Sequence, residues 1–262
     1  VLLTYLTINM KIGIFTSFQN NKIVKQAIES CKSLGVDYEV VDIINENWLD
    51  NVRNSDCDGF FCPSNCISQE LKTIQDERYY FVSQVMKRPI YPDFNGLYIH
   101  ENKRNMAAWL ELNNYAHAKT KVFTNIENAI NYLSDCEYPI VTKANVGAAA
   151  SKVRIIKNKR KAIRMAKKCL PKKFIFKLLS LGLFYKTKVG FLNLPDLHNP
   201  QKDYFIVQDF VKDILWEWRI LKIGDSYFGH QKLLEGQFAS GSGKVGWVAP
   251  PQHLLEMVRE LC

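Results

Sequence analysis

The feature that most restricts the fold is an alternation of strand-like and helix-like segments near the N-terminus. The stretches "KIGIFT" (11–16), "DYEVVDI" (37–43) and "DGFFCP" (58–63) predict strands. Between the first two, residues 21–35 carry apolar side chains at helical spacing and end at Gly35. This alternation favours a small parallel sheet with crossover helices. No glycine-rich dinucleotide turn follows the first strand, so the function of the sheet is not visible from the sequence.

A proline- and glycine-bearing joint at 87–96 separates this region from a second one. We expect residues 10–95 to form one domain and 96–262 another. The second region begins with a strand-like "GLYIH" (96–100) and a helix over 101–116. The following segments predict a strand at 119–124, a helix at 125–133, a strand pair at 137–156 and a basic helix at 157–170. Three strands at 202–213, 216–224 and 226–236 are expected to form an antiparallel meander, and a helix follows at 254–261.

Both ends of the sequence suggest further chain. A good first strand begins directly after Met10, so we expect residues 1–9 to be a non-native or upstream extension. The last stretch, "PQHLLEMVRELC" (251–262), stops inside a helical pattern, and we expect a C-terminal part to be missing.

Charge and cysteine usage limit the function classes. The formal net charge of +9 favours anionic partners, and no apolar run is long enough to span a bilayer. Seven scattered cysteines without a secretory signal indicate reduced thiols and a cytoplasmic location. Cys57, Cys62 and Cys66 do not have the spacing of paired zinc knuckles, so no metal site is predicted there.

In "EYPIVTKANVGAAASKVRII" (137–156), Lys143 lies between an apolar segment and a run of small residues. The pattern predicts a strand, a turn of small residues and a second strand. A buried Lys143 would cost several kcal/mol unless an anion met it, and small residues allow close backbone approach. The combination suggests a phosphate site. The alternative is a lysine on an edge strand that reaches solvent beside an ordinary hairpin.

Six local features follow one another in a fixed order. They are Lys103 at a helix start, Lys143 on its strand, the loop "GAAASKV" (147–153), the strand "YFIVQDFVKD" (204–213), Glu217 and Arg219 alternating on a strand, and Lys232 ahead of a Ser/Gly loop. Together they resemble the ATP-grasp superfamily over about residues 96–262, with a pre-ATP-grasp domain before them. The resemblance implies an α/β fold, an α+β sandwich of ATP-grasp type. It would combine a small parallel pre-ATP-grasp domain with ATP-grasp subdomains built on antiparallel sheets, including a lid at about 136–210.

The resemblance assigns the phosphate contacts to two lysines and a loop. Lys103 and Lys143 would place point charges against ATP oxygens. The loop with Gly147 and Ser151 would cover the phosphates with its backbone N–H groups. The alanines at 148–150 depart from the glycines common there, and alanine restricts positive φ.

The adenine hinge of the family is matched by Gln208, Asp209, Phe210 and Val211. Its main chain at Asp209 and Val211 would pair with the adenine edge, as an edge strand can. Asp213 matches the acid that holds the ribose hydroxyls.

Arg219 matches an arginine that binds the acyl phosphate or the acidic substrate in the family, and Lys232 matches a basic residue that faces the same phosphates. We assign both residues catalytic roles. The implied reaction is ATP-dependent joining of a carboxylate to an amine through an acyl phosphate. The implied cofactors are ATP and Mg²⁺. In the family the Mg²⁺ ligands are an Asp and a Glu-x-Asn pair near the C-terminus, and this pattern has no match near the end of the sequence, so we expect the ligands to lie beyond residue 262.

Other interpretations remain open at the level of sequence. Lys103 could be a surface lysine, and Glu217 with Arg219 a surface ion pair. The alanine-bearing loop would also suit an ATP-grasp module that binds nucleotide without turnover. A third possibility is a basic nucleic-acid-binding protein, suggested by residues 157–173, although no base-stacking motif supports it. The expected partners are a small-molecule carboxylate and amine, with a homodimer possible and no membrane.

Overall fold

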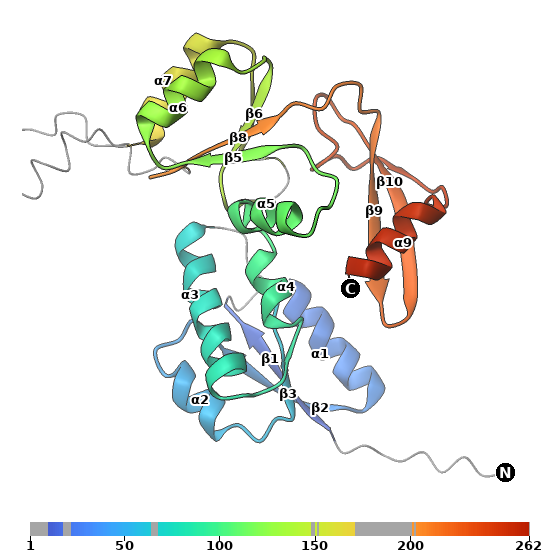
Figure 1. The fold of residues 1–262 in the computed structure, drawn as a ribbon. Helices are drawn as coiled ribbons and strands as arrows, with labels where there is room; N and C mark the ends of the chain where they lie inside the picture. The colour runs from blue at the N-terminus through green and yellow to red at the C-terminus, as the bar shows by residue number, and fades with distance from the viewer. Residues whose placement is uncertain are drawn as a thin grey trace, which may run out of the picture. The chain divides into compact units, whose positions relative to one another are not determined.

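The computed structural model describes residues 10–17, 22–63, 68–147, 150, 152–170, 201 and 203–261. They form two compact units, residues 1–113 and 114–262. Figure 1 shows both. The sequence places a domain boundary earlier, between residues 95 and 96, and that boundary, like the limits of the lid, remains a prediction.

Unit 1 contains a parallel sheet with the strand order β2-β1-β3-β4. Its strands are β1 (Lys11–Thr16), β2 (Asp37–Asp42), β3 (Gly59–Phe61) and β4 (Ile90–Tyr91). The predicted parallel sheet is confirmed. Strand β4 was missed because it is only two residues long and lies among prolines, which hide a strand pattern.

Helices cover both faces of this sheet. Ile14 packs with Val24 and Cys31 of α1 on one face. The next residue, Phe15, packs on the other face with Tyr79 and other residues of the following helices. The helices of unit 1 are α1 (Lys22–Leu34), α2 (Trp48–Asn54), α3 (Gln69–Tyr80), the π-helical turn η1 (Phe81–Val85), α4 (Phe94–Ile99) and α5 (Lys103–Leu112).

The strand predicted at residues 96–100 is wrong. Residues 94–99 form helix α4, whose N-terminus is capped by the Asp93 side chain accepting a hydrogen bond from the Gly96 N–H (3.1 Å). Leu97 is its one buried residue and packs into the core of unit 1. A capping acid four positions before a single buried apolar residue outweighs the short β-like pattern.

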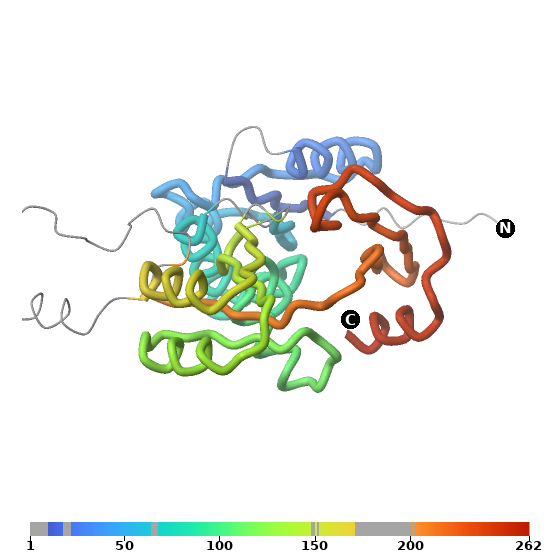
Figure 2. Tube along the Cα trace, turned by 90° about the horizontal axis from the view of Figure 1, so that it is seen from above, coloured from blue at the N-terminus to red at the C-terminus, as the bar shows by residue number. Residues whose placement is uncertain are grey.

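Unit 2 contains an antiparallel sheet with the order β5-β8-β6-β7, and helices α6 and α7 pack on one face of it. The elements are β5 (Thr120–Phe123), α6 (Ile126–Asp135), β6 (Ile140–Lys143), β7 (Val153–Ile156), α7 (Lys159–Cys169) and β8 (Phe205–Asp209). Ile140, Ile156 and Phe205 form the core with the two helices. In Figures 1 and 2, α6 and α7 lie side by side.

The second sheet of unit 2 has the order β11-β10-β9. It comprises β9 (Trp216–Ile223), β10 (Ser226–Leu233) and β11 (Val245–Gly246), and helix α9 (Gln252–Leu261) follows it. The predicted three-strand meander is therefore wrong in one respect. β9 and β10 form a hairpin, whereas β8 pairs with β5 and β6 in the other sheet.

In the part of the chain that the structure describes, no helix combines the length and the apolar character needed to cross a membrane.

Candidate functional site

The site is built around Lys143, the last residue of β6. Its Nζ donates a hydrogen bond to Oε1 of Gln208 on β8, 2.8 Å away and 65 residues further along the chain. Val141 lies opposite Gln208, so Val141, Lys143 and Gln208 share one face of the sheet. Ile140 points to the other face, which α6 and α7 cover. Lys143 therefore lies on the opposite face of the sheet, which α6 and α7 do not cover; we call it the open face.

The alternative of an edge-strand lysine is wrong. Strand β6 lies between β7 and β8: it pairs with β7 from Ile140 to Lys143 and with β8 at Ile140 and Val141, so it is not an edge strand. Lys143 is half-buried and its amine meets a side-chain oxygen.

The amide of Gln208 is held in one orientation. Its Nε2 donates to Oγ1 of Thr120 (2.7 Å) and to the carbonyl of Ala118 (3.4 Å). This arrangement leaves Oε1 facing the lysine amine. Thr120 lies opposite Gln208 in the β5–β8 ladder, so the three side chains form a row across the open face.

Buried polar residues support this sheet from within. The Gln201 side chain donates to Oγ1 of Thr142 (2.9 Å) and accepts from the N–H of Ile206 (3.0 Å). The N–H of Asn145, which is fully buried, donates to the Tyr204 hydroxyl (2.7 Å). Sequence analysis missed these residues, although a buried-strand pattern interrupted by Thr142 and followed by Asn145 is a detectable signal. They fix the strand ends that flank Lys143.

The predicted phosphate loop is described only in part, and Ala148, Ala149 and Ser151 lie outside the described residues. Gly147 has φ +153°, and a Cβ added to it would lie 3.1 Å from Cδ of Lys152. Ala150 adopts φ +57°, the left-handed region that glycine occupies readily. The chain then returns to β7, as the N–H of Val153 donates to the carbonyl of Ala150 (3.0 Å). The turn therefore holds an alanine in a conformation suited to glycine.

The predicted adenine hinge lies at the end of β8. The idea that β8 is a sheet edge is wrong at Asp209, since its N–H donates to the carbonyl of Lys119 (3.0 Å) and β8 lies between β5 and β6. Val211 lies beyond the strand and is 53% exposed. Asp213 has φ +57°. Phe210 is half-buried. The N–H of Asp209 is thus engaged within the sheet.

A polar pocket of about 600 Å³ adjoins this hinge. It lies on the helix-covered side, because Asp209 is opposite the core residue Ile140. Tyr132 of α6 lines it, and burial, together with the charge of Asp209, raises the pKa of the Tyr132 phenol. The full lining is Asn131, Tyr132, Asp135, Cys136, Glu137, Tyr138, Pro139, Asp209, Phe210 and Lys212. This pocket and Lys143 are on opposite faces of the sheet.

The predicted catalytic cations lie together on the β9–β10 hairpin. Lys232 is directly opposite Glu217, and His230 is directly opposite Arg219, so all four side chains share one face. Nη2 of Arg219 lies 2.9 Å from Oε2 of Glu217, in a pair whose side chains are 45% and 42% exposed. The sequence-based alternative of a surface pair is consistent with this exposure.

Lys103 is the first residue of α5, in unit 1, and forms an ion pair with Glu101. The two side chains are 16% and 22% exposed, so Lys103 is not an ordinary surface lysine. Asn102 between them caps the helix by accepting from the N–H of Asn105 (3.3 Å), and Glu101 adopts φ +53°.

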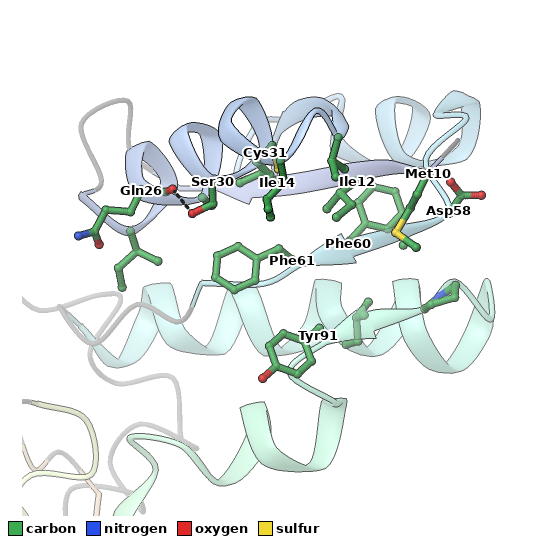
Figure 3. Close-up of a pocket in the computed structure, with 17 residues that line it drawn as sticks. Met10, Ile12, Ile14, Gln26, Ser30, Cys31, Asp58, Phe60, Phe61 and Tyr91 are labelled. Carbon is green, nitrogen blue, oxygen red and sulfur yellow. Dashed lines mark hydrogen bonds between the residues drawn. The ribbon is translucent and has the colours of Figure 1, made fainter. Parts of the chain in front are cut away.

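Unit 1 also contains an apolar groove of about 700 Å³ between α1 and the strands β1, β3 and β4. Figure 3 shows Ile12, Ile14, Phe61 and Tyr91 around it. Its few polar groups, such as Asp58, include no cation, so the groove does not suit a phosphate.

One group of acids and a thiol has the spacing of metal ligands in the described residues: Glu39, Asp56 and Cys57. The amine of Lys11 already pairs with Asp56 and lies 3.7 Å from Glu39. Because a lysine already pairs with these carboxylates and the third group is a thiol, the set does not suit Mg²⁺, which prefers oxygen ligands.

No protein-family model matches the sequence, and the search of curated proteins found no match. Solved structures do match. The chain is similar to a RimK domain ATP-grasp protein from Sphaerobacter thermophilus (TM-score 0.56, 10% identity, covering 95% of this chain and 80% of that one). It is also similar to N5-carboxyaminoimidazole synthetase from Staphylococcus aureus, solved in complex with ADP (TM-score 0.59, 11% identity, covering 96% of this chain and 61% of that one). A third similar structure is an L-amino acid ligase from Bacillus licheniformis (TM-score 0.55, 13% identity, covering 97% of this chain and 60% of that one).

These matches extend over most of the chain, and they show that it has the ATP-grasp fold, as the sequence predicted. The chain spans about 60% of the length of the synthetase and of the amino acid ligase.

Proposed function

We propose that this chain is the nucleotide-binding part of an ATP-dependent ligase that joins a carboxylate to an amine. One observation carries the proposal: the hydrogen bond between Lys143 and Gln208 on the open face of the sheet. Both residues are predicted from sequence to contact ATP, and they come from segments 65 positions apart. The names of the solved relatives, a synthetase and a ligase, point the same way.

The roles of the residues follow from their chemistry. Lys143 would place its charge against the ATP phosphates, and the segment 209–211 would meet the adenine. In the reaction, a carboxylate oxygen attacks the γ-phosphorus and ADP leaves, forming an acyl phosphate. The amine nitrogen then attacks the acyl carbon and phosphate leaves. Arg219 and Lys232, on one face of the β9–β10 hairpin, would neutralise the transferred phosphate.

The proposal assigns no Mg²⁺ ligand among the described residues. The acid-and-thiol group of unit 1 is already paired with Lys11. When bound, Mg²⁺ would supply positive charge that offsets the charge of the phosphates.

Binding of ATP and ADP to the Lys143→Met variant tests the proposal by titration calorimetry. Hydrogen bonds to charged groups contribute about 1.5–3 kcal/mol, so we expect an affinity loss of about 10- to 100-fold. Lys121→Met is the matched control. It removes a lysine from the same sheet, but one whose amine lies 4.6 Å from the ring centre of Tyr132, on the helix-covered side. Equal affinities of the parent and the Lys143→Met variant would overturn the assignment.

A binding module without turnover is the second candidate, and the alanine at position 150 with φ +57° favours it. A backbone that is strained in the phosphate loop could slow loop closure. Formation of ADP that depends on both a carboxylate and an amine would exclude this candidate. ATP binding with no such turnover by the full-length protein would support it.

A further inference from the structure

Helix α7 and the residue two positions before it carry a dense positive charge. Residues 157–170 contain no acidic residue. The seven cations of this stretch are all exposed: Lys157, Lys159, Arg160, Lys161, Arg164, Lys167 and Lys168.

The cations occupy one side of the helix. Ala162, Ala166 and Cys169 are buried and pack against the sheet and α6. With about 3.6 residues per turn, five of the cations fall on the arc opposite these three residues. These five are Arg160, Lys161, Arg164, Lys167 and Lys168. We call this arc the basic face of α7. In Figures 1 and 2, α7 lies beside α6 at the periphery of unit 2.

Within the part of the chain that the structure describes, no acidic side chain pairs with the basic face. Among the ion pairs of the described residues, none involves a residue of α7. Lys159, outside the basic face, reaches a neutral acceptor, the carbonyl of Ser134 (3.4 Å).

This arrangement is unfavourable for the helix itself. Arg160, Arg164 and Lys168 are spaced at i, i+4 and i+8, where like charges repel. Lys159, Arg160 and Lys161 stand in the first turn, where the helix dipole disfavours positive charge. The helix forms because Asn158 caps it, accepting from the N–H of Lys161 (3.0 Å), and because its apolar side is buried. Local stability therefore does not explain the choice of cations.

We infer that the basic face of α7 binds the phosphodiester backbone of nucleic acid without base specificity. Protein partners are usually held by buried aromatic or aliphatic anchors, and the basic face presents only charged side chains. A helix that lies on a membrane inserts its apolar side, but here that side is the core of unit 2. Binding by charge alone, through release of counterions, is the mode of phosphate-backbone contact. The net charge of +9 adds long-range attraction.

Fluorescence anisotropy with a labelled 20-base-pair duplex DNA, at 50 to 200 mM KCl, tests this inference. The slope of log affinity against log salt is about −0.9 for each phosphate neutralised. Five contacts give a slope of about −4.5 and an affinity loss of about 500-fold over this range. In the triple variant Arg160→Gln, Arg164→Gln and Lys168→Gln, two contacts remain. We expect a slope of about −1.8 and a loss of only about 10-fold.

The matched control is Lys22→Gln, Lys25→Gln and Lys32→Gln, three exposed lysines on α1. It changes the net charge by the same amount and should keep the steep slope. A triple α7 variant that retains the parent's salt slope would overturn the inference. An α1 variant whose salt slope falls as much as that of the α7 variant would overturn it too. Binding of the parent to phosphatidylserine vesicles but not to DNA would also overturn it.

A second measurement does not depend on folding of the variant. Lys161, Lys167 and Lys168 of the parent should be protected by the duplex from acetylation, read by mass spectrometry. Lysines of α1 should not be protected. Equal acetylation of the α7 lysines with and without the duplex would contradict the inference.

Discussion

Lys72 and Asp76, an ion pair inside unit 1, provide a sharp test of how this unit is stabilised. The two residues are one turn apart on α3, and their side chains are 2% and 11% exposed. The Lys72 amine also donates to the carbonyl of Leu97 in α4 (2.9 Å). Removing one partner of a buried pair leaves the other charge uncompensated, which costs about 3–5 kcal/mol. We expect this loss for Lys72→Met at pH 8. The free energy of unfolding falls by about 2 kcal/mol per M of urea, so the urea concentration at the unfolding midpoint should fall by about 2 M.

The loss should depend on pH. Burial raises the pKa of the Asp76 carboxyl, while Lys72 opposes that shift. A carboxyl with a raised pKa contributes stability that is present below its unfolded pKa, and that stability is lost as the pH rises through the folded pKa. Without Lys72 the pKa of Asp76 rises further. The destabilisation by Lys72→Met should therefore be smaller at pH 5 than at pH 8, because the carboxyl becomes neutral.

Pulse alkylation of Cys57 and Cys62 in urea measures the unfolding of unit 1 alone. Both thiols are buried in its core, at 4% and 1% exposure, and burial raises their pKa, so they react once the unit opens. The double variant Lys72→Met/Asp76→Leu should recover to within about 1 kcal/mol of the parent, since no charge is left unpaired.

The exposed pair of Asp50 and Arg53 on α2 is the control for this experiment. Its side chains are 69% and 61% exposed, so Arg53→Met should cost less than about 0.5 kcal/mol. If Lys72→Met shifts the midpoint no more than Arg53→Met does, or equally at pH 5 and pH 8, the electrostatic argument is wrong.

Three further substitutions test backbone positions. Gly13→Ala should destabilise unit 1 by about 1–3 kcal/mol, because a Cβ there would lie 2.2 Å from Cδ1 of Phe60; an unchanged alkylation midpoint would show that the ring can move away. Ala150→Gly should stabilise unit 2 by about 0.5 kcal/mol, since glycine accepts φ +57° without steric penalty, whereas Ala162→Gly inside α7 should lose at least about 0.5–1 kcal/mol. The stability of the Ala150→Gly and Ala162→Gly variants is measured by thermal melts and by hydrogen exchange of the β6 and β7 amides. A loss of stability in Ala150→Gly would contradict the assignment of strain.

Much of the secondary structure could be predicted from the sequence. The alternation at residues 11–63 predicts the parallel sheet, and the stretch around Lys143 predicts the β6–β7 pair; both are confirmed. These segments depend on local periodicity, which neighbouring residues define by themselves. The order of the cationic motifs likewise predicts the ATP-grasp fold, which the structural matches confirm.

The errors concern partners and short elements. The sequence placed β8 in a meander with β9 and β10, but β8 lies between β5 and β6. A strand pattern specifies which face is apolar and not which strand lies beside it. Residues 96–100 form part of a helix and its end, because a capping contact to Asp93 competes with a weak β pattern.

The sequence by itself determined that Lys143 ends a strand, that α7 is amphipathic and basic, and that the first strands run parallel. Each of these depends on side chains a few positions apart. Only the tertiary structure decided that Lys143 meets Gln208 and that Lys103 pairs with Glu101. It also decided that the basic face of α7 forms no ion pair with the described residues. Hydrogen bonds and ion pairs act over a few ångströms, so they depend on which distant segments the folded chain brings within that range.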